Sequence, residues 1–193
     1  MQGTLSALSR EISGTDNQLE GEVVITTTDT LARYVLPKLM AKLSRKYEGI
    51  RFSLYMANQL SDISNREADI AIRTCKQPPN NLIGRKVGEL KFIVVASRTY
   101  VKKHKLSEFP KDLSNQHFIV LNESYASVPI YQWFDRCINN QGKSTKVNNF
   151  LCAAALAREG MGICVLPLYM LAKEPMLVEL PTKQKISRND LWV

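Results

Sequence analysis

Hydrophobic positions in the first third of the chain alternate between strand-like and helix-like patterns. Residues 22–27 (EVVITT) are β-branched and read as a strand, and residues 28–47 begin with a capping candidate and continue with apolar residues at helical spacing. A strand-like run at 50–56, a short helix at 60–68 and a buried strand at 69–74 follow. Strands that alternate with helices in this way predict a parallel sheet of the α/β class.

The middle of the chain predicts a change of unit. A polar, proline-containing turn at 75–81 leads to two apolar runs, 82–87 and 91–97, which a Gly-Glu pair joins, and this arrangement predicts a β-ribbon or a pair of neighbouring strands. No glycine-rich linker follows. Any hinge between two units must therefore consist of the strands themselves.

A second α/β unit is predicted from about Ser97 onward. Helical and strand-like patterns again alternate. The predicted helices are 97–104, 129–140 and 149–160, and the predicted strands are 117–121, 144–148 and 162–167. Two last strand candidates are 177–180 and 190–193.

The amino end has a different pattern. Leu5, Leu8 and Ile12 recur at helical spacing, and the following SGTDNQLEG ends that short amphipathic helix, so residues 1–20 are interpreted as the remnant of a linker helix. No apolar run approaches the roughly 20 residues that cross a bilayer, and the start lacks the apolar segment of a secretion signal. We therefore expect a cytoplasmic protein that does not contact a membrane.

Charge and cysteine content change this picture little. The net charge is +8, but Lys38, Lys42, Arg45 and Lys46 alternate with apolar residues, as on a solvated or subunit-interface helix face. Three of the four cysteines have apolar neighbours, as small core residues do. Cys75 follows a strand and borders a possible cleft, so a thiol-sensing role stays open for it.

Motifs of enzymes and metal sites are absent from the sequence. His104 and His117 are the only histidines, and neither has a partner at metal-ligand spacing. The nucleophile elbow, the phosphate-binding loop and the dinucleotide fingerprint do not occur, and Gly160 and Gly162 are interpreted as the end of a helix. We therefore expect neither a metal, a cofactor nor an enzymatic activity.

Four segments, taken in order, resemble the effector-binding domain of LysR-type bacterial transcriptional regulators, which is itself similar to type 2 periplasmic binding proteins. These segments are GEVVITTTDTLARYVLPKLM (21–40), LSDISNREADIAIRT (60–74), VGELKFIVVASRTYVKKH (87–104) and CAAALAREGMGICVLP (152–167). Each segment alone is a weak signal. Their common order and spacing, from residue 21 to residue 167, carry the resemblance.

The resemblance implies an α/β fold of two Rossmann-like lobes joined by two crossover strands, of the periplasmic-binding-protein type 2 kind. Lobe I would comprise 21–94 and 188–193, and lobe II would comprise 95–187, with crossovers at 91–97 and from 190. It further implies an effector-binding domain that senses a small, anionic metabolite in the cleft between the lobes. The alternative is a solute-binding protein of a transport system, which shares the two-lobed cleft.

The resemblance also carries expectations about partners. It implies a homodimer or higher homo-oligomer that uses the helix at 30–46, with effector binding passed on through oligomer rearrangement. In this family the winged helix-turn-helix at the amino end contacts DNA, and the sequence lacks it. DNA binding is therefore expected only through that absent amino-terminal domain.

Candidate ligand-binding residues follow from a general rule: ligands of open α/β sheets lie beyond the carboxyl ends of the strands. The rule selects the loops after the predicted strands of both units. In the first unit the loops offer Thr28, Asp29, Thr30, Asn58, Gln59, Arg73 and Thr74. In the second they offer Ser124, Tyr125, Asn148, Asn149 and Phe150.

The chemistry of these residues leaves alternatives open. Thr hydroxyls and Asn amides near helix amino ends favour an anion or carboxylate, but the same residues are common helix caps. Arg73 could bind two oxygens of an oxyanion, pair with Asp69 or point outward. Asp29 would repel an anion, so it caps the helix, faces away or indicates a ligand that bears an amine. Tyr125 could simply be packed in its loop.

Overall fold

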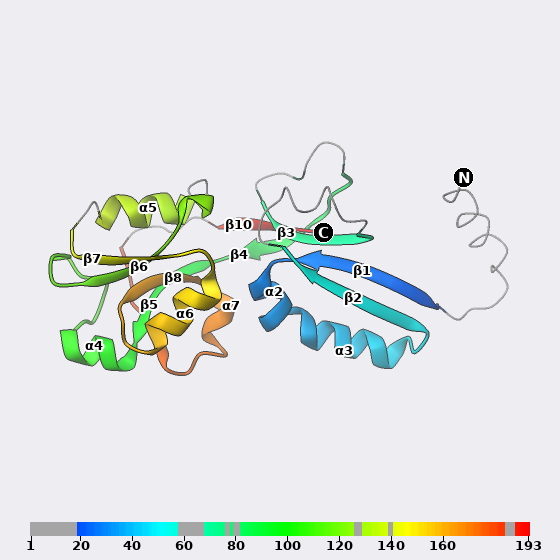
Figure 1. Ribbon diagram of the computed structural model, residues 1–193, viewed down its shortest axis with the longest axis horizontal. Coiled ribbons are helices and arrows are strands. Elements are labelled where there is room, and N and C mark those ends of the chain that lie inside the picture. The colour runs from blue at the N-terminus through cyan, green and yellow to red at the C-terminus, as the bar shows by residue number, and fades with distance from the viewer. Residues whose placement is uncertain are drawn as a thin grey trace.

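The computed structural model describes residues 19–57, 68–75, 78, 82–125, 129–138, 141–183 and 188–193. Figure 1 shows two lobes side by side along the long axis of the molecule. The helix predicted near the amino end lies outside the described residues, as does all but the last residue of the helix predicted at 60–68. In the part that is described, the strands form two five-stranded sheets.

The first sheet has the order β2-β1-β3-β10-β4. Strand β1 (Gly21–Thr27) lies between β2 (Ile50–Met56) and β3 (Ile70–Thr74) and pairs in parallel with both. The last strand of the chain, β10 (Asn189–Trp192), lies antiparallel between β3 and β4 (Lys86–Leu90). The predicted parallel pairing of the first three strands is confirmed.

Helices α2 (Asp29–Tyr34) and α3 (Leu36–Lys46) follow β1. The single helix predicted at 28–47 is therefore wrong: the chain breaks at Val35, and Pro37, which lacks an N–H, occupies the first turn of α3. Leu36 anchors the junction of the two helices, since its side chain is 3% exposed. The two short helices can therefore take different directions.

The second sheet has the order β7-β6-β8-β5-β9. Strand β6 (His117–Leu121) lies in parallel between β7 (Lys143–Val147) and β8 (Ile163–Pro167), and β5 (Phe92–Ser97) pairs antiparallel with β8 and β9 (Leu177–Glu179). The remaining elements of this lobe are α4 (Arg98–His104), the short 3-10 helix η2 (Glu123–Tyr125), α5 (Pro129–Ile138), α6 (Phe150–Arg158) and α7 (Leu168–Leu171). The predicted second α/β unit is confirmed.

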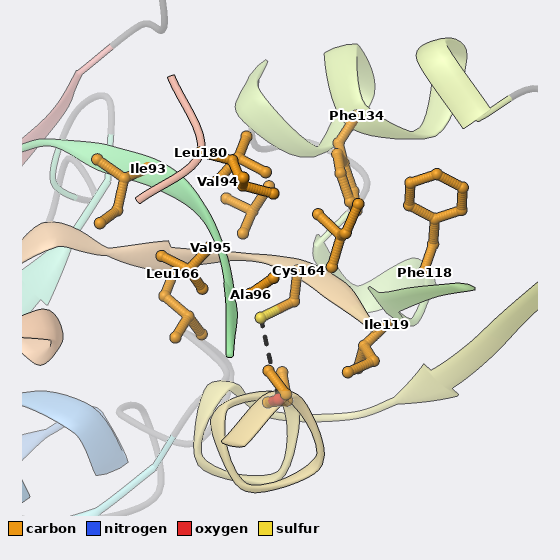
Figure 2. Close-up of a cluster of buried hydrophobic side chains, with 14 of the residues drawn as sticks. Ile93, Val94, Val95, Ala96, Phe118, Ile119, Phe134, Cys164, Leu166 and Leu180 are labelled. Carbon is orange, nitrogen blue, oxygen red and sulfur yellow. Dashed lines mark hydrogen bonds between the residues drawn. The ribbon is translucent and has the colours of Figure 1, made fainter. Parts of the chain in front are cut away.

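The core of the second lobe lies on both faces of its sheet. Figure 2 shows α5 on one face, with Phe134 pointing toward the sheet, and α6 on the other. All six residues of β5 are buried, and the rings of Phe118 and Phe134 meet edge to face with centroids 5.8 Å apart. Cys164 is fully buried, and its Sγ contacts the carbonyl oxygen of Ala153 on α6 at 3.9 Å. The sheet is thus packed between two covering layers of helix.

The link between the lobes differs from the predicted β-ribbon. Gly88 and Glu89 lie inside β4 and form no turn, and β4 and β5 belong to different sheets, separated by Lys91 alone. Residues 92–94, which the sequence division placed with the first lobe, pair with β8 of the second sheet. The local Gly-Glu signal was misleading because the partners of both strands lie about 70 or more residues farther along the chain.

Candidate functional site

The carboxyl end of β1 is followed by Thr28 and then by Asp29 and Thr30 in the first turn of α2, a segment that we call the loop after β1. Thr28 has an extended backbone, and its carbonyl oxygen accepts a hydrogen bond from the amide of Ala32 at 2.9 Å. Among the described residues, the Thr28 side chain makes no capping hydrogen bond to α2. The Oδ1 atom of Asp29 accepts instead from the amide of Thr30 at 2.7 Å. The capping alternative therefore applies to the acidic residue rather than to Thr28.

Two tyrosines of the second lobe face this loop. The Tyr169 hydroxyl, on α7, donates a hydrogen bond to Oγ1 of Thr30 at 2.8 Å. Burial first, and then the nearby Asp29 carboxylate, raise the pKa of Tyr125 to about 12. Burial likewise raises the pKa of Tyr169 to about 12, and Asp29 adds to that shift. Both hydroxyls are thus protonated at neutral pH and close enough to Asp29 to interact with its charge.

The other end of α2 also contacts the second lobe. Tyr34 donates from its hydroxyl to Oε1 of Glu174 at 2.7 Å, and the rings of Tyr34 and Tyr169 have centroids 6.5 Å apart. We call this region the interlobe junction: Thr28 and α2 on one side, Tyr125, Tyr169 and Glu174 on the other. Figure 1 shows α2 at the side of the first lobe that faces the second.

The predicted residues at the start of α6 have structural roles. Asn149 is the N-cap of α6, and its side-chain oxygen accepts from the amide of Cys152 at 2.7 Å. The Nδ2 atom of Asn149 also donates to Oδ1 of Asn148 at 3.0 Å. The ring of Phe150 lies edge to face with that of Tyr125, with centroids 5.3 Å apart. The start of α6 is thereby connected to the interlobe junction through Tyr125.

The remaining predicted residues of the first lobe lie elsewhere in its sheet. Arg73 is 6% exposed, and its Nη2 donates to Oγ1 of Thr26 at 2.7 Å. Asp69, the partner considered for Arg73, accepts from the amide of Val24 at 2.9 Å. Thr74 lies in β3 opposite Leu191. Asn58 and Gln59 lie outside the described residues, so their positions stay predictions.

A small pocket of about 170 Å³ adjoins the junction on the α5 side of β6. Tyr125 and Tyr131 line it together with Asn122, and at its rim Lys146 pairs with Glu123 at 2.8 Å. That ion pair is exposed, so it contributes little to stability. Tyr125 thus borders both the pocket and the interlobe junction.

The described part of the chain gives little support for a metal site or for thiol sensing. The described residues contain no group of three or more His, Cys, Asp or Glu side chains arranged to hold a metal ion. Burial, and then the charge of Asp190, raise the pKa of the half-buried Cys75 thiol, which disfavours the thiolate that thiol sensing requires. Among the same residues, no helix has the length and apolar character to traverse a bilayer.

Three residues of the junction were missed by the sequence reasoning: Tyr34, Tyr169 and Glu174. Tyr169 comes two residues after the end of β8, so the rule that selected the other loops would also have selected it. No local pattern indicates Tyr34 or Glu174, because their contact joins residues 140 positions apart. Of the predicted residues, Asp29, Thr30 and Tyr125 are brought together.

Comparisons with known proteins agree with this architecture. A model of the LysR substrate binding domain matches residues 16–193. The chain is 24% identical over 188 residues to the probable HTH-type transcriptional regulator LtrA of Klebsiella pneumoniae; the match covers 90% of this chain and 59% of that protein. The chain therefore spans about three fifths of this curated relative.

Two solved structures share the fold. CrgA, a LysR-type transcriptional regulator from Neisseria meningitidis, matches with a TM-score of 0.75 at 19% identity, over 98% of this chain and 66% of that one. The regulatory domain of Synechocystis PCC6803 CcmR, solved in complex with 2-PG, matches with a TM-score of 0.69 at 19% identity, over 90% of this chain and 86% of that one. The expected two-lobed fold class is confirmed.

Proposed function

Because this chain belongs to the LysR substrate-binding domain family, we propose that it binds a small-molecule effector at the interlobe junction and passes the bound state on through oligomer rearrangement. The observation that carries the proposal is the convergence of Tyr125 and Tyr169 on the loop after β1. That loop lies where open α/β sheets bind ligands. The curated relative is a transcriptional regulator, so it gives no support to an enzyme or to the solute-binding alternative.

The charges at the junction favour a particular ligand chemistry. Asp29 disfavours an anion at the amino end of α2, and Thr30 already accepts the Tyr169 hydroxyl. The amino end of α6 has the opposite character, because the helix dipole attracts negative charge to the region of Asn149 and Phe150. We therefore propose an anionic effector whose acidic group lies near α6 and whose hydroxyl or amino group donates to Asp29.

The proposal extends to partners that the family implies. A homodimer or higher homo-oligomer would use α3, where Leu39 is 48% exposed beside the exposed Lys38 and Lys42. DNA would be bound through an amino-terminal domain of the complete regulator. A cytoplasmic location follows from that role.

The test uses matched small molecules rather than an assumed effector. A panel of 2-hydroxy acids, each with its amide and its deoxy acid, would be titrated against the protein by calorimetry and by thermal shift. A ligand at 100 times its Kd raises the free energy of unfolding by about 2.7 kcal/mol. We expect at least one 2-hydroxy acid to bind, and both its amide and its deoxy form to bind at least tenfold more weakly.

A variant pair locates the site. Thr28→Val should weaken binding, because the Thr28 hydroxyl lies in the loop after β1. Thr99 is an exposed threonine of α4, so Thr99→Val should leave binding unchanged. Equal weakening by both variants, or tight binding that Thr28→Val does not alter, would contradict the site. A panel in which the amides bind as well as the acids would contradict the anionic class.

A further inference from the structure

Helix α2 is hydrogen-bonded to the second lobe at two points one turn apart. Thr30 accepts the Tyr169 hydroxyl at 2.8 Å, and Tyr34 donates to Glu174 at 2.7 Å. Positions four residues apart lie on the same face of a helix, so both contacts hold one face of α2 against the segment 169–174. We call these four residues the α2 clamp.

The surroundings of the α2 clamp make its contacts persistent. Thr30 is 3% exposed and Glu174 is 7% exposed, so water has little access to compete for either partner. Arg158 on α6 approaches Glu174 at 3.5 Å and thereby connects the carboxylate to a further helix of the second lobe. Burial, and then the hydrogen bond to Glu174, raise the pKa of Tyr34 to about 12, so its hydroxyl remains a donor at neutral pH.

The direction of α2 in turn determines where α3 begins. Only Val35 separates the two helices, and its backbone amide bonds to the carbonyl oxygen of Leu31 at 3.0 Å. Leu36, almost fully buried, fixes the first residue of α3. A shift of α2 would therefore change the position of α3 instead of being absorbed by a flexible loop.

We propose that Tyr34 and Tyr169 are positioning residues that fix α2 to the second lobe and so couple the state of that lobe to α3. This inference rests on the proposed function, because the family resemblance implies self-association through the segment 30–46, of which α3 is the longer part. The coupling itself is a property of the chain without any ligand. Its test therefore needs no effector.

Hydrogen exchange measured by mass spectrometry on the whole chain tests the coupling. Tyr169→Phe removes a hydrogen bond to a neutral acceptor, so the amides of α2 should exchange about fivefold faster than in the unmodified protein. In Tyr34→Phe, whose acceptor is a carboxylate, the increase should be about tenfold or more. In both variants peptides from α3 should change as well, while β6 and β7 should keep their protection. Glu174→Gln retains an acceptor and should give a smaller increase than Tyr34→Phe.

The control is Tyr100→Phe, which removes a hydroxyl that donates to Gln116 at 3.0 Å and accepts from the amide of His117 at 2.9 Å inside the second lobe. It should affect exchange near β6 and leave α2 and α3 unchanged. Unchanged α2 exchange in both clamp variants, an equal increase in Tyr100→Phe, or an increase in α2 that stops short of α3 would each overturn the proposal. If the exchange results are as expected but the small-molecule panel shows no binding, the proposed function alone is contradicted.

Discussion

Gly162, the residue directly before β8, should not tolerate even one added methyl group. A Cβ atom at this position would lie 2.3 Å from the backbone oxygen of His117 and 2.8 Å from its carbonyl carbon. Both atoms belong to the backbone of β6, which pairs in parallel with β8 at Phe118 and Ile119. The clash can therefore be relieved only by moving one strand of the second sheet away from the other.

The magnitude follows from the cost of overpacking a rigid core. Inserted methylenes cost typically 1–3 kcal/mol, and a backbone contact cannot rotate away, so Gly162→Ala should lower the free energy of unfolding by about 3 kcal/mol. For a chain of this size, about 2–4 °C of Tm accompanies each kcal/mol, which gives a decrease of about 6–12 °C. Urea unfolding followed by circular dichroism measures the first quantity, and calorimetry measures the second.

Gly88→Ala provides the matched control. Gly88 lies in β4 with ordinary backbone angles, and among the described residues no atom lies within 4 Å of its added Cβ. We expect a change within about 1 kcal/mol, with a slight gain from the reduced freedom of the unfolded chain. If Gly162→Ala proved as stable as Gly88→Ala, the close approach of β6 and β8 would be refuted.

Two further predictions concern titration and thiol chemistry. The pKa is raised from 10.0 to about 12 at three tyrosines, Tyr34, Tyr125 and Tyr169. Because the folded protein holds these protons more tightly than the unfolded chain, their contribution to stability is present below pH 10 and should be lost between pH 10 and 12. A urea midpoint that stays constant over this range would contradict the shifts. The exposed Cys152 should react with a thiol reagent first, and the buried Cys164 only after unfolding. Cys152→Ser should therefore remove the fast phase from the time course of thiol modification. A fast phase that persists would place the reactive thiol elsewhere.

Much of the fold could be predicted because its strands and helices alternate with periods that local sequence reveals. The strands predicted at 22–27 and 69–74 correspond to β1 and β3, although β3 is mostly half-buried, and their parallel pairing follows from the intervening helix. The predicted ribbon around Gly88 was wrong because strand partners are chosen by long-range packing. The Gly-x-Gly at the end of α6 combines two roles: Gly160 has a positive φ of 79°, and Gly162 permits a close approach.

The sequence predicts only those residues of the candidate site that directly follow the carboxyl ends of strands. The rule placed Asp29 and Tyr125 in loops that meet at the interlobe junction. It could not show that Arg73 is buried against Thr26, because side-chain direction depends on which face of the sheet a residue occupies. The contact between Tyr34 and Glu174 depends on how two separate lobes dock, and no periodicity within either segment contains that information.

The position of β10 has a consequence for the order in which the protein is made. All strands described for the second sheet have been synthesised once Glu179 has emerged from the ribosome, but the first sheet must wait for residues 189–192, which separate β3 from β4. Until then β4 has no neighbour in its own sheet among the described strands. The strands of the first sheet therefore become available for pairing later than those of the second, although β1 is the first strand to be synthesised.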